Sequence, residues 1–226
     1  MSASAGGPAP GEVHVWCADL DTAGDAVLLH DAERARVERI MREPARRRAA
    51  ARRSVLRELI AWSTGLDPAT LPIVADAHGR PSCPAAPDLD FSCTSSGRRA
   101  LYALVRGARV GIDVELVADG PLPVSRYMTE RELAAGIDPL RAWVVKEAVA
   151  KGVGMGLSLP PAGIEIERLE PEPAVHLRGE WAPFAGGGWH VLLLDGDGWL
   201  GAVAGDRAPE RVVCREWSGY ALGVTR

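Results

Sequence analysis

The sequence predicts an α+β fold built from two similar α/β subdomains. Three observations favour it: the order strand, helices, strands occurs twice in the 226 residues, the helices are segregated from the strands, and the strands follow one another as hairpins. A doubly wound parallel sheet would instead alternate strands with helices. We expect a disordered lead-in over residues 1–11, an N-terminal subdomain over 12–108 and a C-terminal subdomain over 109–226, although no sequence repeat relates the two.

In the N-terminal part, "VHVWCADL" (Val13–Leu20) has the pattern of a first strand. Helical patterns extend from about Ala32 to Thr64, with Pro44 suited to open the second helix and Gly65 to close it. "LPIVADAHGRPSCP" predicts a strand that runs into a Gly/Pro turn. "LDFSCTSSGRRALYALVRGARVGIDVELV" then predicts three strands with breaks at "TSSGRR" and "RGAR".

In the C-terminal part, two helix starts are marked by capping residues. "TERELAAG" begins with a capping box from Thr129 to Glu132, and Asp138–Pro139 opens a longer helix that we expect to end at Gly152. The remaining chain predicts short strands, the clearest being "GIEIERL", the hairpin "WHVLLLDGDGWLGAVAG" and "RVVCREW".

The composition excludes several classes of protein. Apolar residues make up 47% and charged residues 25%, and the net charge of −4 does not favour a nucleic-acid partner. No apolar run approaches the roughly 20 residues of a membrane span, and the start lacks the pattern of a secretory signal. The four cysteines and five histidines have no zinc or redox-motif spacing. We therefore expect a cytoplasmic protein with reduced thiols and no membrane contact.

The strand "VGIDVE" places two carboxylates on one face. Because alternate strand residues share a face, Asp113 and Glu115 stand roughly 6–7 Å apart, opposite the apolar face of Val110, Ile112 and Val114. Such a strand is often only amphipathic, with a solvated acidic face. Paired carboxylates also suit a divalent cation, so both interpretations stay open on this motif alone.

The two lysines of the chain, Lys146 and Lys151, lie on either side of Glu147, and the other 24 basic residues are arginines. Trp143, Glu147 and Lys151 follow one another at i, i+4 and i+8, so they form one helical stripe. Glu147 could complete an all-oxygen Mg²⁺ site. An ammonium has an adjustable pKa, which a guanidinium lacks, although two surface lysines on a helix would be the plainer explanation.

A dense arginine run covers the first helical region. It is either a solvated face or an anion site, and local clustering in an acidic chain favours the anion site. Its members are Arg34, Arg36, Arg39, Arg42, Arg46, Arg47, Arg48, Arg52, Arg53 and Arg57. "GVGMG" is not a dinucleotide motif, because it closes a helix instead of opening one.

"VGIDVE" followed about thirty residues later by "WVVKEAVAKGVGMGLSLP" resembles the 4′-phosphopantetheinyl transferases, most closely the two-lobed surfactin-type branch with its pseudo-twofold fold. "GRP" (Gly79–Pro81) resembles a further family motif. The resemblance runs from about Ala32 to Pro160. It implies transfer of the 4′-phosphopantetheine arm of coenzyme A to a serine of an acyl or peptidyl carrier protein in fatty acid, polyketide or nonribosomal peptide biosynthesis, with release of 3′,5′-ADP.

The resemblance also assigns roles. Asp113, Glu115 and Glu147 would bind Mg²⁺, while Glu147 and Lys151 would act in catalysis, so the C-terminal subdomain would carry the metal site and the N-terminal one a basic coenzyme A surface. Coenzyme A contacts would come from these residues: Arg34, Arg36, Arg48, Arg80, Thr94, Ser95, Lys146 and Lys151. Glu132 fits a family glutamate that follows an aromatic pair, here Tyr127-Met128. The branch is typically monomeric, and its carriers are acidic and helical.

One position departs from the family. The family reads F-N-L/I-S-H-S before the metal strand, whereas this chain reads "FSCTSS", with Ser95 in place of the histidine that contacts coenzyme A. Ser95 keeps a hydrogen-bonding group but no charge. Two alternatives remain open: a homologue that binds coenzyme A or a carrier protein with impaired transfer, and a Mg²⁺-dependent hydrolase of nucleotides or diphosphates.

Overall fold

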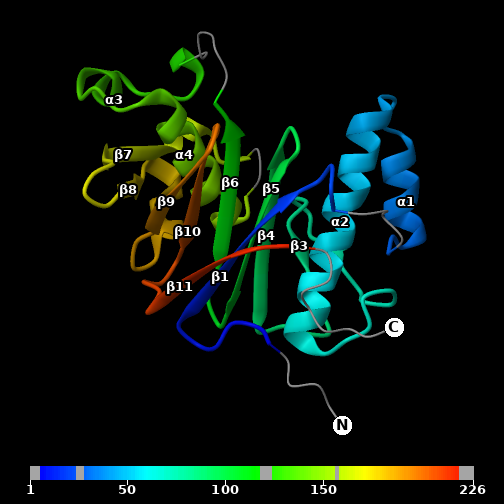
Figure 1. The fold of residues 1–226 in the computed structure, drawn as a ribbon. Coiled ribbons are helices and arrows are strands. Elements are labelled where there is room, and N and C mark those ends of the chain that lie inside the picture. Colours follow the sequence, from blue (N-terminus) through cyan, green and yellow to red (C-terminus); the bar gives the residue numbers. More distant parts are fainter. Residues whose placement is uncertain (1–5, 24–27, 118–123, 156–157, 219–226) are drawn as a thin grey trace.

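Two larger sheets, each covered on its outer face by one long helix, form the centre of the structure (Figure 1). It is a computed structural model that describes residues 6–23, 28–117, 124–155 and 158–218. The first half contains β1 (Glu12–Asp19), α1 (Asp31–Glu38), α2 (Glu43–Thr64), β4 (Leu89–Ser96) and β5 (Arg99–Arg106). The second half contains β6 (Val110–Leu116), α4 (Pro139–Val153), β9 (His190–Gly196) and β10 (Trp199–Gly205). The predicted α+β fold class is confirmed.

Shorter elements surround these halves. They are β2 (Val74–Ala75), β3 (Pro81–Ser82), α3 (Glu130–Ala134), β7 (Ile164–Arg168), β8 (Ala174–Leu177) and β11 (Arg211–Glu216), with 3-10 turns at Val124–Arg126, Pro161–Gly163 and Gly179–Ala185. The first sheet has the order β11-β1-β5-β4 and the second the order β6-β10-β9. None of the helices in the described ranges is both long and apolar enough to cross a membrane.

Three apolar clusters define the layers helix, sheet, sheet, helix. The outer cluster of the first half packs α2 on its sheet through Leu56, Leu59, Phe91, Tyr102 and Leu104. The outer cluster of the second half packs α4 on its sheet through Val145, Ala148, Val149, Ala202 and Ala204. The inner cluster joins the two sheets through Val15, Leu101, Ile112, Val114 and Val203. Strand residues therefore alternate between an inner and an outer core, as the period of two requires.

The predicted helix ends are confirmed at four places and wrong at one. Pro44 lies in the first turn of α2, and Gly65 ends it in the left-handed region at φ 74°. The Thr129–Glu132 capping box and the Asp138 cap both form. The predicted end at Gly152 is wrong, because α4 continues to Val153 and Gly154 takes the left-handed conformation at φ 82°.

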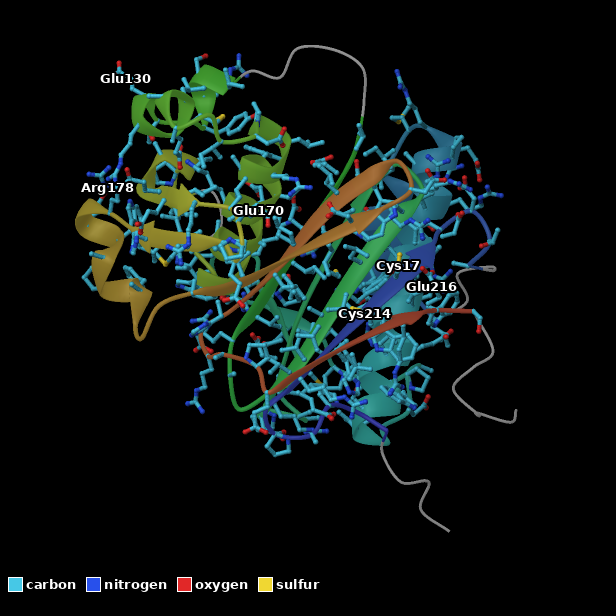
Figure 2. All side chains as sticks on the ribbon, turned by 60° about the vertical axis from the view of Figure 1, so that its left-hand side comes forward. Cys17, Glu130, Glu170, Arg178, Cys214 and Glu216 are labelled. Carbon is cyan, nitrogen blue, oxygen red and sulfur yellow. The ribbon has the colours of Figure 1, made fainter. Side chains whose placement is uncertain are left out.

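The last strand does not join the sheet of the subdomain to which the sequence assigned it. β11 pairs in parallel with β1, and Cys17 lies opposite Glu216 in the register. Figure 2 shows Cys17 on β1 beside Cys214 and Glu216 on β11. Because both faces of β1 are buried, β1 is a central strand that needs a neighbour on each side. The range 109–226 is therefore corrected: its final strand completes the first sheet.

The predicted disordered lead-in, residues 1–11, lies partly outside the described residues. Its described part rests on the end of α2, where the N–H of Gly6 donates to the carbonyl of Trp62 at 3.2 Å. A side chain at Gly6 would meet the Trp62 ring. Residues 6–11 are thus in contact with the first half of the fold.

The close approach of α4 to β6 yields a testable prediction. A Cβ on Gly111 would overlap the carbonyl oxygen of Ala148 and the amide of Gly152. Because backbone atoms cannot give way as a flexible side chain does, we expect Gly111→Ala to lower the free energy of unfolding by about 3 kcal/mol, the upper end of the usual cost of overpacking. Gly187→Ala is the matched control, because nothing lies within 4 Å of its Cβ position. Urea unfolding measures both, and equal stabilities would contradict the close approach.

Candidate active site

The candidate site lies where the two sheets meet, along a seam between β4 and β6. These strands belong to different sheets, and side chains on one face of β4 bridge them. Asp90 accepts a hydrogen bond from the N–H of Val110 (2.8 Å), and Ser92 accepts one from the N–H of Ile112 (3.3 Å). The hydroxyls of Thr94 and Ser96 donate to Asp113 (3.0 Å) and Glu115 (2.8 Å), respectively. The alternation of β4 thus presents acceptors and hydroxyls to β6 in register.

Asp113 and Lys151 form the centre of the seam. The Lys151 ammonium donates to Asp113 Oδ1 at 2.5 Å and to the Thr94 hydroxyl at 3.2 Å. The side chain of Asp113 is only 5% exposed. Its Oδ2 is buried and has no hydrogen-bond partner among the described residues. A buried carboxylate oxygen without a donor is costly in a folded protein and is a common feature of functional sites.

The carboxylates of the seam are held in a partly desolvated, mutually repulsive environment. Burial raises the pKa of Asp113, and the Lys151 ammonium offsets only part of that rise. Burial, followed by the negative charge of Asp113, raises the pKa of Glu147 above its usual range. Raised carboxyl pKa values in a cluster indicate groups suited to accept a proton or to bind a cation.

Glu115 is fixed by the predicted helical stripe. Its Oε1 accepts a hydrogen bond from the Trp143 indole at 3.4 Å, and its Oε2 accepts one from Ser96. Trp143 itself packs edge-on against Tyr127, with ring centroids 5.0 Å apart. The predicted arrangement, in which α4 presents Trp143, Glu147 and Lys151 to the acidic face of β6, is therefore present.

The chemistry of these donors fits a hard cation, but they are not arranged as a finished metal site. Across the described ranges, no group of three or more His, Cys, Asp or Glu side chains is positioned to hold a metal ion. Lys151 holds Asp113, whereas Trp143 and Ser96 hold Glu115, so the carboxylates are drawn toward different partners. A bound cation would give the unpartnered Oδ2 of Asp113 a ligand and would offset the charge repulsion between Glu147 and Asp113.

A cavity of about 420 Å³ adjoins the seam. Its charged lining comprises five cationic side chains and one carboxylate: Arg36, Arg52, Arg53, Arg80, Lys151 and Glu33. Glu33 is already paired with Arg53 and Arg57. The cavity is therefore strongly positive, and its size suits a small ligand. Lys151 belongs to both the cavity and the carboxylate cluster, so an anion in the cavity would lie next to Asp113.

The predicted coenzyme A contacts divide into three groups. Arg36, Arg80 and Lys151 line the cavity, and Thr94 lies beside it at Lys151. Arg48 lies elsewhere, because its Nε and Nη2 both donate to the Asp21 carboxylate at 2.7 Å. Arg34 is exposed and donates to the carbonyl of Leu29 at 3.4 Å. Neither Arg34 nor Arg48 is among the residues that line the cavity, so the structure does not bring these two predicted contacts together with the others.

Sequence reasoning missed three basic side chains that line the cavity: Arg52, Arg53 and His78. Arg52 and Arg53 belong to the arginine run but were not singled out, because the face of α2 that meets the cavity depends on where α1 packs. His78 directly precedes the "GRP" motif. Ser95 lies on the opposite face of β4 from Thr94 and is not among the cavity-lining residues.

Comparisons with known proteins agree with this geometry. A family model described as the 4′-phosphopantetheinyl transferase superfamily matches residues 109–204, the segment that carries the acidic strand and α4. A 4′-phosphopantetheinyl transferase of Bacillus subtilis is 32% identical over 116 residues, which are 47% of this chain and 51% of that protein. The predicted resemblance to the 4′-phosphopantetheinyl transferases is confirmed over this segment.

Two further proteins show similarity to this chain. The 4′-phosphopantetheinyl transferase HetI of Nostoc sp. is 29% identical over 214 residues, covering 85% of this chain and 87% of that protein. The alignment with the Bacillus relative spans only about half of that relative's length. A solved Helicobacter pylori holo-[acyl-carrier-protein] synthase in complex with coenzyme A is 20% identical and covers 42% of this chain and 96% of that chain, with a TM-score of 0.38.

The structure does not bring Lys146, a predicted coenzyme A contact, to the seam or the cavity. Its side chain is 0% exposed, and its ammonium donates to Glu132 and to the carbonyl of Tyr127, both at 2.8 Å. One residue along α4 from Glu147, it points about 100° away from the seam, into the core beneath α3. Lys146 therefore fixes α3 to α4.

Glu132 is the centre of this buried contact. Its carboxylate also accepts hydrogen bonds from the N–H of Thr129 at 2.8 Å and of Ile166 at 2.7 Å. Although burial raises its pKa, the bonds from Lys146 and from these backbone groups together lower the pKa of Glu132. The glutamate that the family resemblance singled out joins α3, α4 and β7.

Replacing Lys146 separates a structural role from a ligand-binding one. Lys146→Met would leave Glu132 buried without its cation, so we expect the free energy of unfolding to fall by about 3–5 kcal/mol. The double variant Lys146→Met/Glu132→Gln should recover part of the loss, because the buried charge is removed. Chemical denaturation measures both. An unchanged stability together with weaker coenzyme A binding would show that Lys146 contacts the ligand.

Proposed function

We propose that this protein transfers the 4′-phosphopantetheine arm of coenzyme A to a serine of an apo acyl or peptidyl carrier protein and releases 3′,5′-ADP. The observation that carries the proposal is the position of Lys151. It lines the positive cavity and also binds Asp113 at 2.5 Å, so the cavity for the phosphates and the carboxylates for the reaction adjoin at one ammonium. The match of residues 109–204 to the 4′-phosphopantetheinyl transferase superfamily model supports the same reaction class.

The cavity would hold the nucleotide end of coenzyme A. Arg36, Arg52 and Arg53 extend from α1 and α2 into it and can form charge-assisted hydrogen bonds with phosphate oxygens. The 3′-phosphate and the pyrophosphate together need several such donors. Because Ser95 replaces the family histidine and carries no charge, these arginines and His78 would supply the positive charge.

Asp113, Glu115 and Glu147 would hold Mg²⁺ against the pyrophosphate. A bound Mg²⁺ would neutralise charge on the transferring phosphoryl group and on the carboxylates. The buried Oδ2 of Asp113 has no hydrogen-bond partner among the described residues, so it would be the oxygen that binds the cation. Lys151 binds the other oxygen, Oδ1, and also lines the cavity, so its charge would lie where the leaving group forms.

The chain's own side chains suit the proton transfer and the departure of the leaving group. Burial and neighbouring charge raise the pKa of Glu147, which makes it a stronger base than an ordinary glutamate. Glu147 would take the proton from the carrier serine as that oxygen forms its bond to phosphorus. The bond from phosphorus to the 3′,5′-ADP oxygen breaks, and the Lys151 ammonium balances the negative charge of 3′,5′-ADP.

The partner would be an acidic, helical carrier domain of fatty acid, polyketide or nonribosomal peptide synthesis, and the protein would act as a cytoplasmic monomer. The test is to incubate the protein with coenzyme A, Mg²⁺ and an apo carrier protein and to weigh the carrier by mass spectrometry. A gain of one phosphopantetheine arm supports the proposal. Coenzyme A binding without a mass gain on any carrier tested would favour the impaired, binding-only homologue.

A site variant tests the roles within this reaction. Asp113→Asn keeps the shape of the side chain but removes the charge that Lys151 and a cation need, so we expect turnover to fall at least about a hundredfold. The fold should be retained, because Asn can still accept the hydrogen bond from Thr94. Glu167→Gln is the control, since Glu167 is exposed and pairs with His176 at 3.0 Å. Near-normal turnover of Asp113→Asn would refute the assignment.

A further inference from the structure

Arg80, at the wall of the cavity, has a guanidinium that is almost fully committed to protein oxygens. Its Nη1 donates to the carbonyls of Lys151 and Gly152, and its Nη2 donates to Asp90 at 2.5 Å and to the carbonyl of Val110 at 3.0 Å. The two terminal nitrogens carry four hydrogens, and these four acceptors match them. Only Nε–H is left for a ligand in the cavity.

Two of these acceptors belong to the last turn of α4. The carbonyls at the end of a helix have no intrahelical partner, and they carry the negative end of the helix dipole. A guanidinium placed there satisfies the carbonyls and neutralises the dipole. Because one of the two carbonyls is that of Lys151, the contact fixes the backbone from which the Lys151 ammonium reaches Asp113 and the cavity.

The other side of Arg80 is anchored at the seam. Asp90 on β4 binds Arg80 and also accepts the N–H of Val110 at 2.8 Å, while Arg80 itself binds the carbonyl of Val110. Arg80 therefore joins β4, the start of β6 and the end of α4. Asp90 is not among the residues that line the cavity, so it is linked to the cavity through Arg80 and to the seam through the N–H of Val110.

We infer that Arg80 is a positioning residue, which fixes the Lys151 end of α4 against the seam, and not a phosphate contact. The inference rests on the proposed function. It makes a prediction that a phosphate contact would not: lysine, which can bind a phosphate as a point charge, cannot replace arginine here, because one ammonium cannot span oxygens on three elements.

The kinetic test compares Arg80→Lys with Asp90→Asn. We expect both to lower kcat for carrier modification at least about tenfold while the KM for coenzyme A changes less than about threefold, as when an interaction acts mainly in the transition state. Arg36→Ala, which removes a cavity cation without an α4 contact, should instead raise the KM. A raised KM with unchanged kcat in Arg80→Ala, restored by Arg80→Lys, would overturn the inference.

Arg106→Lys is the matched control for the substitution itself. Arg106 also bridges a carboxylate and a backbone carbonyl, Asp88 at 2.5 Å and Ser63 at 2.6 Å, but lies outside the site. Its lysine variant should keep both kinetic constants. If it loses kcat as Arg80→Lys does, the effect reports general destabilisation and the inference fails.

A readout without catalysis separates this inference from the proposed function. Amide hydrogen exchange of the α4 end, residues 148–154, should become at least about tenfold faster in Arg80→Lys and in Asp90→Asn, and stay unchanged in Arg106→Lys. If exchange changes as expected but the wild-type protein modifies no carrier, the proposed function fails and the positioning contact stands. Unchanged exchange refutes the positioning role, whatever the activity.

Discussion

The row of polar side chains that β4 presents to β6 is the contact on which the site depends. The two strands lie at the edges of separate sheets, and an edge strand leaves N–H and C=O groups without partners. Asp90, Ser92, Thr94 and Ser96 bind β6 at the spacing of alternate residues. Because this row fixes the position of β6 along β4, it also fixes where Asp113 and Glu115 lie relative to α4.

The position of α4 on this seam determines which carboxylate each of its two lysines neutralises. α4 directs Lys151 to the seam and Lys146 to the core, and each lysine meets one carboxylate, Asp113 or Glu132. The two ion pairs differ in burial: the side chain of Lys151 is 32% exposed, whereas that of Lys146 is 0% exposed. Lys151 is therefore free to exchange partners with a ligand, while Lys146 serves packing alone.

The local features of this fold could be predicted from the sequence because short-range chemistry determines them. Helix caps, the hairpins and the two faces of "VGIDVE" depend on residues a few positions apart. The helical stripe likewise follows from the 3.6-residue period, which separates Lys151 from Lys146. The sequence could not indicate that Lys146 is buried, because that depends on α3 folding back to place Glu132 over α4.

Long-range placement was the part that sequence could not supply. The return of β11 to β1 joins residues about 200 positions apart, and nothing in "RVVCREW" specifies its partner. The arginine run posed the same difficulty, because only tertiary packing decides that Arg52 and Arg53 face the cavity while Arg48 binds Asp21. "GRP" suggested a phosphate contact for Arg80, whereas the structure shows its guanidinium bound to the end of α4.

The central claim is that the arginine cavity of the first half and the carboxylates of the second half form one coenzyme A site across the seam. A crystal structure of the protein with coenzyme A and Mn²⁺ tests it most directly, because anomalous scattering locates the metal. We expect one metal peak between Asp113, Glu115 and Glu147, with the pyrophosphate beside it and the nucleotide among Arg36, Arg52 and Arg53. Coenzyme A bound away from this cavity, or a metal away from these carboxylates, would contradict it.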